Sequence, residues 1–133
     1  MNSKDDFTGV RILVVDDHML TRDMVKSILR GLGYTNIVQA ENGHVALNKI
    51  EEEEIGLVIC DWNMPNLSGL EVLQEVRRIR GTKELPFLML TAEAYRENVA
   101  VAVQAGVSDY IAKPFTADTL GEKVERILRD SLS

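Results

Sequence analysis

Hydrophobic residues fall into short runs that alternate with longer amphipathic stretches along the whole chain. The runs cover Val10–Val15, Asn36–Ala40, Leu57–Cys60, Pro86–Leu90 and Tyr110–Ala112. Short apolar runs with few polar interruptions are typical of strands that are buried on both faces, as in a parallel sheet. The pattern therefore predicts five parallel strands.

A helical period appears between the strands. After the first run, apolar residues recur at intervals of three or four, which predicts one apolar face on a helix that begins near His18. The residues on that face are Leu20, Met24, Val25, Ile28, Leu29 and Leu32. Four more helices are predicted over Val45–Ile50, after Ser68, over Ala94–Ala105 and from Thr116. The helix after Ser68 opens with Ser-Gly-Leu-Glu, which matches a capping box.

Five strand–helix units in succession predict an α/β fold with helices on both faces of a parallel sheet. We expect a single-domain flavodoxin-like (βα)5 doubly wound sheet, because right-handed crossovers leave few other topologies. The predicted strand order is 2-1-3-4-5. At 133 residues, the chain fits a short N-terminal arm over 1–9 and one domain over 10–131, with no output domain.

Composition and charge exclude several classes of protein. The formal net charge of −6 at pH 7 argues against a nucleic-acid surface, which needs a basic patch. Cys60 is the only cysteine, so an internal disulfide and a cysteine-rich zinc site are both excluded. No apolar run reaches the length of a membrane span, and residues 1–9 are unlike a signal peptide. We expect a cytoplasmic protein.

Polar residues stand where four of the five predicted strands end. They are Asp16 and Asp17, Asp61, Thr91 and Lys113. Each residue alone has a structural explanation, as a turn former, a helix cap or a strand terminator. Parallel strands, however, place all these ends on one edge of the sheet, where open α/β sheets bind ligands. The joint placement indicates a functional site.

The chemistry of these residues points to phosphoryl transfer. Three adjacent carboxylates repel one another, and a hard cation such as Mg²⁺ relieves that repulsion with carboxylate, carbonyl and water ligands. Thr91 and Lys113 offer a hydroxyl and an ammonium group for phosphoryl oxygens. Asp61, the most isolated acid, is the candidate nucleophile, which would form an aspartyl phosphate. His18 would suit a transition metal, but the oxygen ligands favour Mg²⁺, so we interpret His18 as a helix-start residue.

Six short motifs stand out in the sequence: Val14-Val15-Asp16-Asp17, Asp61-Trp62-Asn63-Met64-Pro65, Gly69, Thr91-Ala92-Glu93-Ala94, Ala105-Gly106 and Lys113-Pro114-Phe115-Thr116. Together they resemble the motifs of the receiver domains of two-component response regulators. The similarity extends from Val10 to about Leu128 and is closest to the chemotaxis regulators of that family. The resemblance implies that Asp61 receives phosphate from a histidine kinase. It also implies Mg²⁺ on Asp17, Asp61 and the Asn63 carbonyl, with Asp16 acting through water.

Further roles follow from the same resemblance. Thr91 and Lys113 would hold the phosphoryl group, and Thr91 and Tyr110 would form a switch. Asn63 and Glu93, each two residues beyond a site residue, would tune the lifetime of the phosphorylated state. The peptide bond before Pro114 is expected to be cis.

The resemblance also implies a way of signalling. The protein would be a monomer that changes its affinity for a protein target, and it would catalyse only its own phosphorylation and dephosphorylation. The expected surface comprises the fourth helix, the fifth strand and the fifth helix, over Ala94–Ala105 and Tyr110–Leu128. The expected target is a flagellar motor switch protein.

Three alternatives stay open at this stage. A phosphorelay intermediate would pass its phosphate to a second histidine. A small-molecule phosphohydrolase would need Asp-x-Asp after the first strand, whereas Asp16 and Asp17 are adjacent. A flavodoxin would need a hydroxyl-rich loop there, and Asp-Asp-His would repel the phosphate of FMN. His18 and Asp109 occupy positions with no fixed preference in the family, so the resemblance assigns them no role and leaves the identity of the partner open.

Overall fold

The five predicted strands form one parallel sheet in the order β2-β1-β3-β4-β5, which confirms the predicted fold class and topology. The computed structural model describes residues 7–92 and 96–132. Its strands are β1 (Ile12–Val15), β2 (Ile37–Ala40), β3 (Leu57–Asp61), β4 (Phe87–Thr91) and β5 (Asp109–Ala112). Its α-helices are α1 (Met19–Gly31), α2 (Gly43–Glu52), α3 (Gly69–Arg78), α4 (Arg96–Gln104) and α5 (Ala117–Leu132), with a 3₁₀ turn, η2, at Arg80–Thr82.

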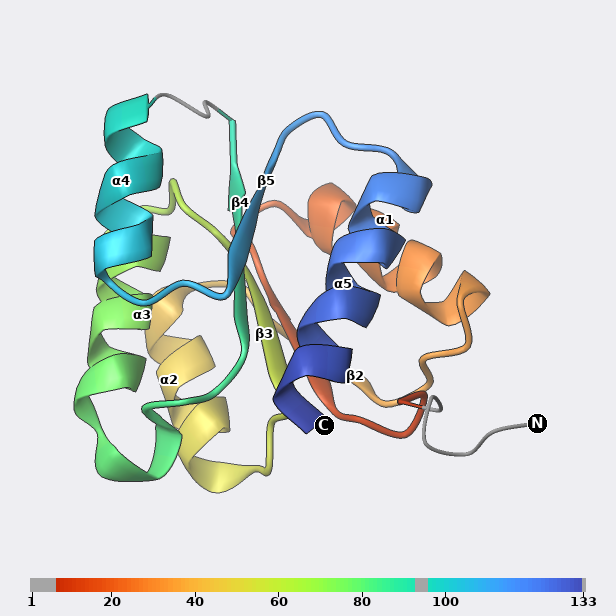
Figure 1. The fold of residues 1–133 in the computed structure, drawn as a ribbon, viewed down its shortest axis with the longest axis horizontal. Coiled ribbons are helices and arrows are strands. Elements are labelled where there is room, and N and C mark those ends of the chain that lie inside the picture. The colour runs from red at the N-terminus through yellow and green to blue at the C-terminus, as the bar shows by residue number, and fades with distance from the viewer. Residues whose placement is uncertain (1–6, 93–95, 133) are drawn as a thin grey trace.

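Helices cover both faces of the sheet. Figure 1 shows α1 and α5 on one face and α2, α3 and α4 on the other. The side chains of the central strands alternate between two apolar cores, as the period of a strand requires. In β3, for example, Leu57 and Ile59 join the core beneath α1 and α5, whereas Val58 and Cys60 join the core beneath α2 and α3. The central strands are therefore buried on both sides.

The predicted apolar face of α1 is only partly buried. Val25 and Leu29 are fully buried, but Leu20, Met24 and Leu32 are exposed, Leu20 to 80%. The helix packs mainly on β1 and α5, so only a narrow stripe of it is enclosed. The spacing of apolar residues sets the direction of a buried stripe and leaves its width undetermined.

Two smaller expectations can also be compared. The first strand begins at Ile12 and not at Val10, because the Val10 amide donates to the Phe7 carbonyl in a turn. The capping box at Ser68 and Glu71 is confirmed, with both of its hydrogen bonds present. Residues 1–6 of the expected arm and Ala94 of the expected fourth helix lie outside the described residues. Within the described residues, no helix has the length and apolarity needed to cross a membrane.

Candidate functional site

Strand register brings the predicted site residues to one edge of the sheet. Val15 pairs with Cys60, so Asp16 and Asp17 follow β1 at the level where Asp61 ends β3. Thr91 ends β4 opposite Ala112, and Lys113 follows directly. The four strand ends thus deliver five polar side chains to the carboxyl edge of the sheet, two of them on each side of the central strand.

Lys113 bridges two of the carboxylates. Its Nζ atom lies 3.0 Å from Asp61 Oδ1 and 3.3 Å from Asp16 Oδ2. Both acids are buried, with Asp16 fully enclosed and Asp61 3% exposed. A buried carboxylate is costly unless it is paired, so the ammonium group allows the two acids to sit side by side.

The site keeps an excess of negative charge. Burial raises the pKa of Asp61, and the charges of Asp16 and Asp17 raise it further, although the hydrogen bond from Lys113 opposes the shift. Burial lowers the pKa of Lys113, but its ion pairs with Asp61 and Asp16 outweigh that effect and the pKa is raised. Three carboxylates and one ammonium group leave the site attractive to a further cation.

The loop that carries Asp16 and Asp17 is held on several sides. The Asp16 amide donates to the Ala40 carbonyl at 3.2 Å. The Asp16 carbonyl accepts from Arg22 Nη1 at 2.7 Å, and Arg22 Nε donates to Gln39 Oε1 at 3.1 Å. Sequence analysis missed Arg22, whose position one helical turn beyond His18 was the only available signal. Arg22 is a positioning residue, because it ties the loop after β1 to β2.

The side chains of Asp16, Asp17 and His18 could together bind a metal ion. One ligand atom from each residue lies within 4.8 Å of the others. Asp17 Oδ1 is buried and accepts no hydrogen bond from any described residue, although His18 Nδ1 is 3.3 Å away. An unsatisfied buried carboxylate oxygen calls for an explanation, and a bound divalent cation supplies one. The carboxylate oxygens of Asp16 and Asp17 therefore suit the expected Mg²⁺.

The main chain around Asp61 is packed tightly against the start of α3. The Trp62 amide donates to the Leu90 carbonyl, and the Gly69 amide donates to the Trp62 carbonyl, each at 2.8 Å. A Cβ atom on Gly69 would lie 2.2 Å from the Asp61 carbonyl oxygen, far inside contact distance. Glycine is required there by close approach, and the end of β3 is fixed in place.

The remaining predicted residues occupy different surroundings. Thr91 is buried at the end of β4, and Tyr110 is partly buried in β5. Lys123 Nζ lies 5.6 Å from the centroid of the Tyr110 ring and 3.1 Å from each carboxylate oxygen of Asp109. This places Asp109, which sequence analysis left without a role, beside the candidate switch.

Three further expectations complete the account of the site. Asn63 is exposed in the loop after β3. Glu93 lies outside the described residues. The expected cis peptide bond between Lys113 and Pro114 is confirmed.

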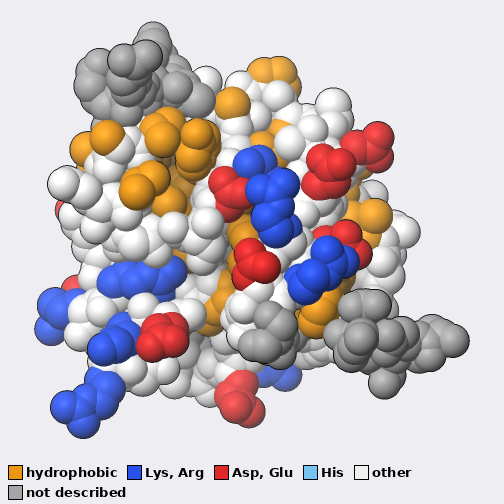
Figure 2. All heavy atoms as spheres, viewed as in Figure 1, with side chains coloured by type: hydrophobic (Ala, Val, Ile, Leu, Met, Phe, Trp, Pro, Cys, Tyr) orange, Lys and Arg blue, Asp and Glu red, His pale blue; other side chains and the backbone are white. Residues whose placement is uncertain are grey.

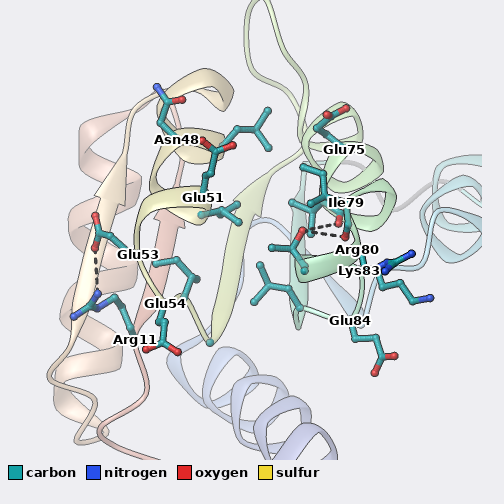
Figure 3. Close-up of a pocket in the computed structure, with 18 of the residues that line it drawn as sticks. Arg11, Asn48, Glu51, Glu53, Glu54, Glu75, Ile79, Arg80, Lys83 and Glu84 are labelled. Atoms are coloured by element: carbon teal, nitrogen blue, oxygen red, sulfur yellow. Dashed lines mark hydrogen bonds and ion pairs between the residues drawn. The ribbon is translucent and has the colours of Figure 1, made fainter.

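A cavity of about 900 Å³ lies at the opposite edge of the sheet and is separate from this site. Figure 3 shows its mixed rim, where Arg11 pairs with Glu53 and where Arg80 and Lys83 accompany further glutamates. Charges of both signs give it no clear ligand preference. No local sequence pattern predicts this cavity, because its walls come from helices and loops that are far apart in the sequence.

Comparison with known sequences identifies relatives over most of the chain. Residues 12–125 match the response regulator receiver domain. The chain is 46% identical over 119 residues to chemotaxis protein CheY-3 of Vibrio cholerae serotype O1, covering 90% of this chain and 92% of that protein. It is 44% identical over 118 residues to chemotaxis protein CheY of Pseudomonas aeruginosa, covering 89% and 95%.

Solved structures agree with the sequence relatives. The chemotaxis response regulator CheY4 of Vibrio cholerae superposes with a TM-score of 0.85 at 34% identity, covering 91% of this chain and all of that one. A CheY-like response regulator receiver domain protein from Methanospirillum hungatei gives a TM-score of 0.85 at 32% identity, covering 92% and 96%. The resemblance expected from the motifs is thus confirmed, and the chain belongs to the response regulator receiver domain family.

Proposed function

We propose that the protein is a phosphoacceptor response regulator that takes a phosphoryl group from a histidine kinase onto Asp61. The observation that carries the proposal is the position of Asp61, buried at the end of the central strand. Lys113 lies 3.0 Å away, and Asp16 and Asp17 lie on the neighbouring strand end. The kinase would be the donor, and residues 10–131 would form the receiver domain.

Each residue has a role in that transfer. A carboxylate oxygen of Asp61 would attack phosphorus, and the phosphorus–nitrogen bond of the donor phosphohistidine would break as imidazole leaves. The Lys113 ammonium group and the Thr91 hydroxyl would bind the phosphoryl oxygens. The residues proposed to hold Mg²⁺ are Asp17, Asp61 and Asn63 through its carbonyl, with Asp16 acting through water. When bound, Mg²⁺ would neutralise charge on the carboxylates and the phosphoryl group.

Intact-mass measurement after incubation with acetyl phosphate and Mg²⁺ tests the assignment. The wild type should gain one phosphoryl group, and Asp61→Asn should gain none. Asp118→Asn is a matched control, because Asp118 is an exposed aspartate in the first turn of α5. Labelling of Asp61→Asn at the wild-type level would show that the phosphoacceptor is another residue.

The output surface is proposed to comprise α4, β5 and α5. Figure 2 shows hydrophobic side chains gathered over α4, where Val101 and Val103 are exposed, and charged side chains over α5. An apolar helix face beside charged groups suits a protein partner. The names of the relatives support chemotaxis as the setting. The partner that we propose is a flagellar motor switch protein. We propose that the protein is a regulator and that it catalyses only its own phosphorylation and dephosphorylation. We also propose that it acts as a monomer.

A further inference from the structure

Helix capping does not explain the orientation of the His18 side chain at the start of α1. It is the N-cap residue of that helix, yet its side chain makes no capping hydrogen bond. The side chain is 70% exposed, but Nδ1 is directed to the carboxylates, 3.3 Å from both Asp16 Oδ1 and Asp17 Oδ1. The imidazole thus presents a nitrogen to the same point in space as two carboxylate oxygens.

The spacing of these three atoms fits ligands of one metal ion. Adjacent ligands of an octahedral ion at about 2.1 Å lie about 3.0 Å apart. The separations of 3.3 Å from Nδ1 to each oxygen are close to that value. Lys113 contacts Asp16 through the other oxygen, Oδ2, while Asp16 Oδ1 accepts a hydrogen bond from the His18 amide at 2.9 Å. Asp17 Oδ1 is buried and accepts no hydrogen bond from any described residue, so it is the carboxylate oxygen best placed to face a metal beside His18 Nδ1.

A histidine nitrogen binds transition-metal dications much better than it binds Mg²⁺. Mg²⁺ takes oxygen ligands and dehydrates reluctantly, so it gains little from an imidazole. First-row transition-metal dications bind imidazole well, and their affinity for a site with nitrogen and oxygen donors rises through Mn²⁺, Co²⁺ and Ni²⁺. The sequence interpretation of His18 as a plain helix-start residue is therefore incomplete.

We infer that His18 Nδ1 is a direct ligand, beside Asp16 and Asp17, for a first-row transition-metal dication at the phosphorylation site. The site would then accept Mg²⁺ through its oxygens alone and hold a transition metal more tightly through the added nitrogen. This inference rests on the proposed function, because it uses the metal site of that proposal.

Calorimetric titration with Co²⁺ and, separately, with Mg²⁺ tests the inference. Removing His18 as His18→Ala or His18→Gln should raise the Kd for Co²⁺ by about tenfold or more, since even outer-shell partners of metal ligands contribute about 10–100-fold. The Kd for Mg²⁺ should stay at its wild-type value. His44→Ala is the matched control, because His44 is the second histidine and is exposed on α2.

A spectroscopic measurement separates direct ligation from a general electrostatic effect. Electron spin-echo modulation of bound Mn²⁺ should show coupling to a nitrogen nucleus in the wild type and in His44→Ala, and none in His18→Ala. Equal Co²⁺ affinity in the wild type and His18→Ala, or nitrogen coupling that persists without His18, would overturn the inference. Failure of the wild type to bind Mg²⁺ would instead contradict the proposed function.

Discussion

Two opposing effects act on the pKa of the Asp61 side chain. Burial favours its neutral form, whereas Lys113 favours its ionised form, and burial prevails because the pKa is raised. The position of Asp61 at a strand end could be predicted from the sequence, since a polar residue closes an apolar run. The contacts of Arg22 and His18 could not, because they depend on how side chains of a loop and a helix meet after folding.

The raised pKa of Asp61 predicts a pH dependence of stability in metal-free protein. A carboxyl whose pKa is higher in the folded state stabilises the fold below its ordinary pKa of about 3.9, and that contribution is lost as pH rises through the raised pKa. Asp61→Asn cannot ionise, so its free energy of unfolding should fall less than that of the wild type as pH rises through this window. Urea denaturation at several pH values measures the difference, with Asp118→Asn as the control. Parallel profiles for wild type and Asp61→Asn would contradict the prediction.

Asn63 is predicted to tune the lifetime of the phosphorylated state. It lies two residues beyond Asp61 and is exposed, so its side chain can orient water that attacks the phosphoryl group. Asn63→Ala should change the rate of phosphate loss while leaving the urea midpoint close to wild type. The control is Asn48→Ala, an exposed asparagine on α2. Decay curves of phosphorylated Asn63→Ala that superimpose on the wild type would assign lifetime control elsewhere.

At the scale of helices and strands, sequence patterns predicted best the features that depend on one segment alone. The apolar runs predicted five strands and the Ser-Gly-Leu-Glu pattern predicted the start of α3, and both were confirmed. The extent of burial on α1 could not be predicted from its periodicity, because it depends on which neighbours the helix meets. Periodicity describes one helix, whereas burial is a property of two packed surfaces.

The capping box is predicted to contribute to stability as a reciprocal pair. The Glu71 amide donates to Ser68 Oγ at 3.2 Å, and Glu71 Oε1 accepts from the Ser68 amide at 2.9 Å. Ser68→Ala should lower the free energy of unfolding by about 1 kcal/mol. Because both residues belong to one motif, the losses from Ser68→Ala and Glu71→Ala should not add in the double variant. Urea denaturation of the four proteins measures this, and strictly additive losses would show that the two hydrogen bonds act independently.

At the scale of the whole molecule, Mg²⁺ is predicted to stabilise the fold. A ligand that binds only the folded state adds about 1.4 kcal/mol at tenfold its Kd. The Asp17→Ala variant should lose most of this increment, because it removes the unsatisfied oxygen proposed as a ligand, and its metal-free stability should be preserved or raised. Thermal melts with and without Mg²⁺ provide the measurement. A wild-type melting temperature that does not respond to Mg²⁺ would refute the prediction.

The switch is also a property of the whole domain. Phosphorylation should draw Thr91 toward the phosphoryl oxygens and move Tyr110, which is a bias between two states of the protein. Beryllofluoride, a phosphoryl mimic, should strengthen binding of a motor switch peptide to the wild type and have less effect on Thr91→Ala. Amide chemical shifts of β5 and α4 report the coupling directly. Shifts that stay fixed when beryllofluoride is added would show that the two regions are not linked.

The ion pair between Lys113 and Asp16 joins residues 97 positions apart. During synthesis at about 5–20 residues per second, roughly 5–20 s separate the addition of the acid from that of its partner. A chain that has just passed Asp61 already has all three aspartates but has neither the ammonium group nor the last strand of the sheet. Competence for phosphoryl transfer would therefore begin only after Lys113 has been added and β5 has joined β4.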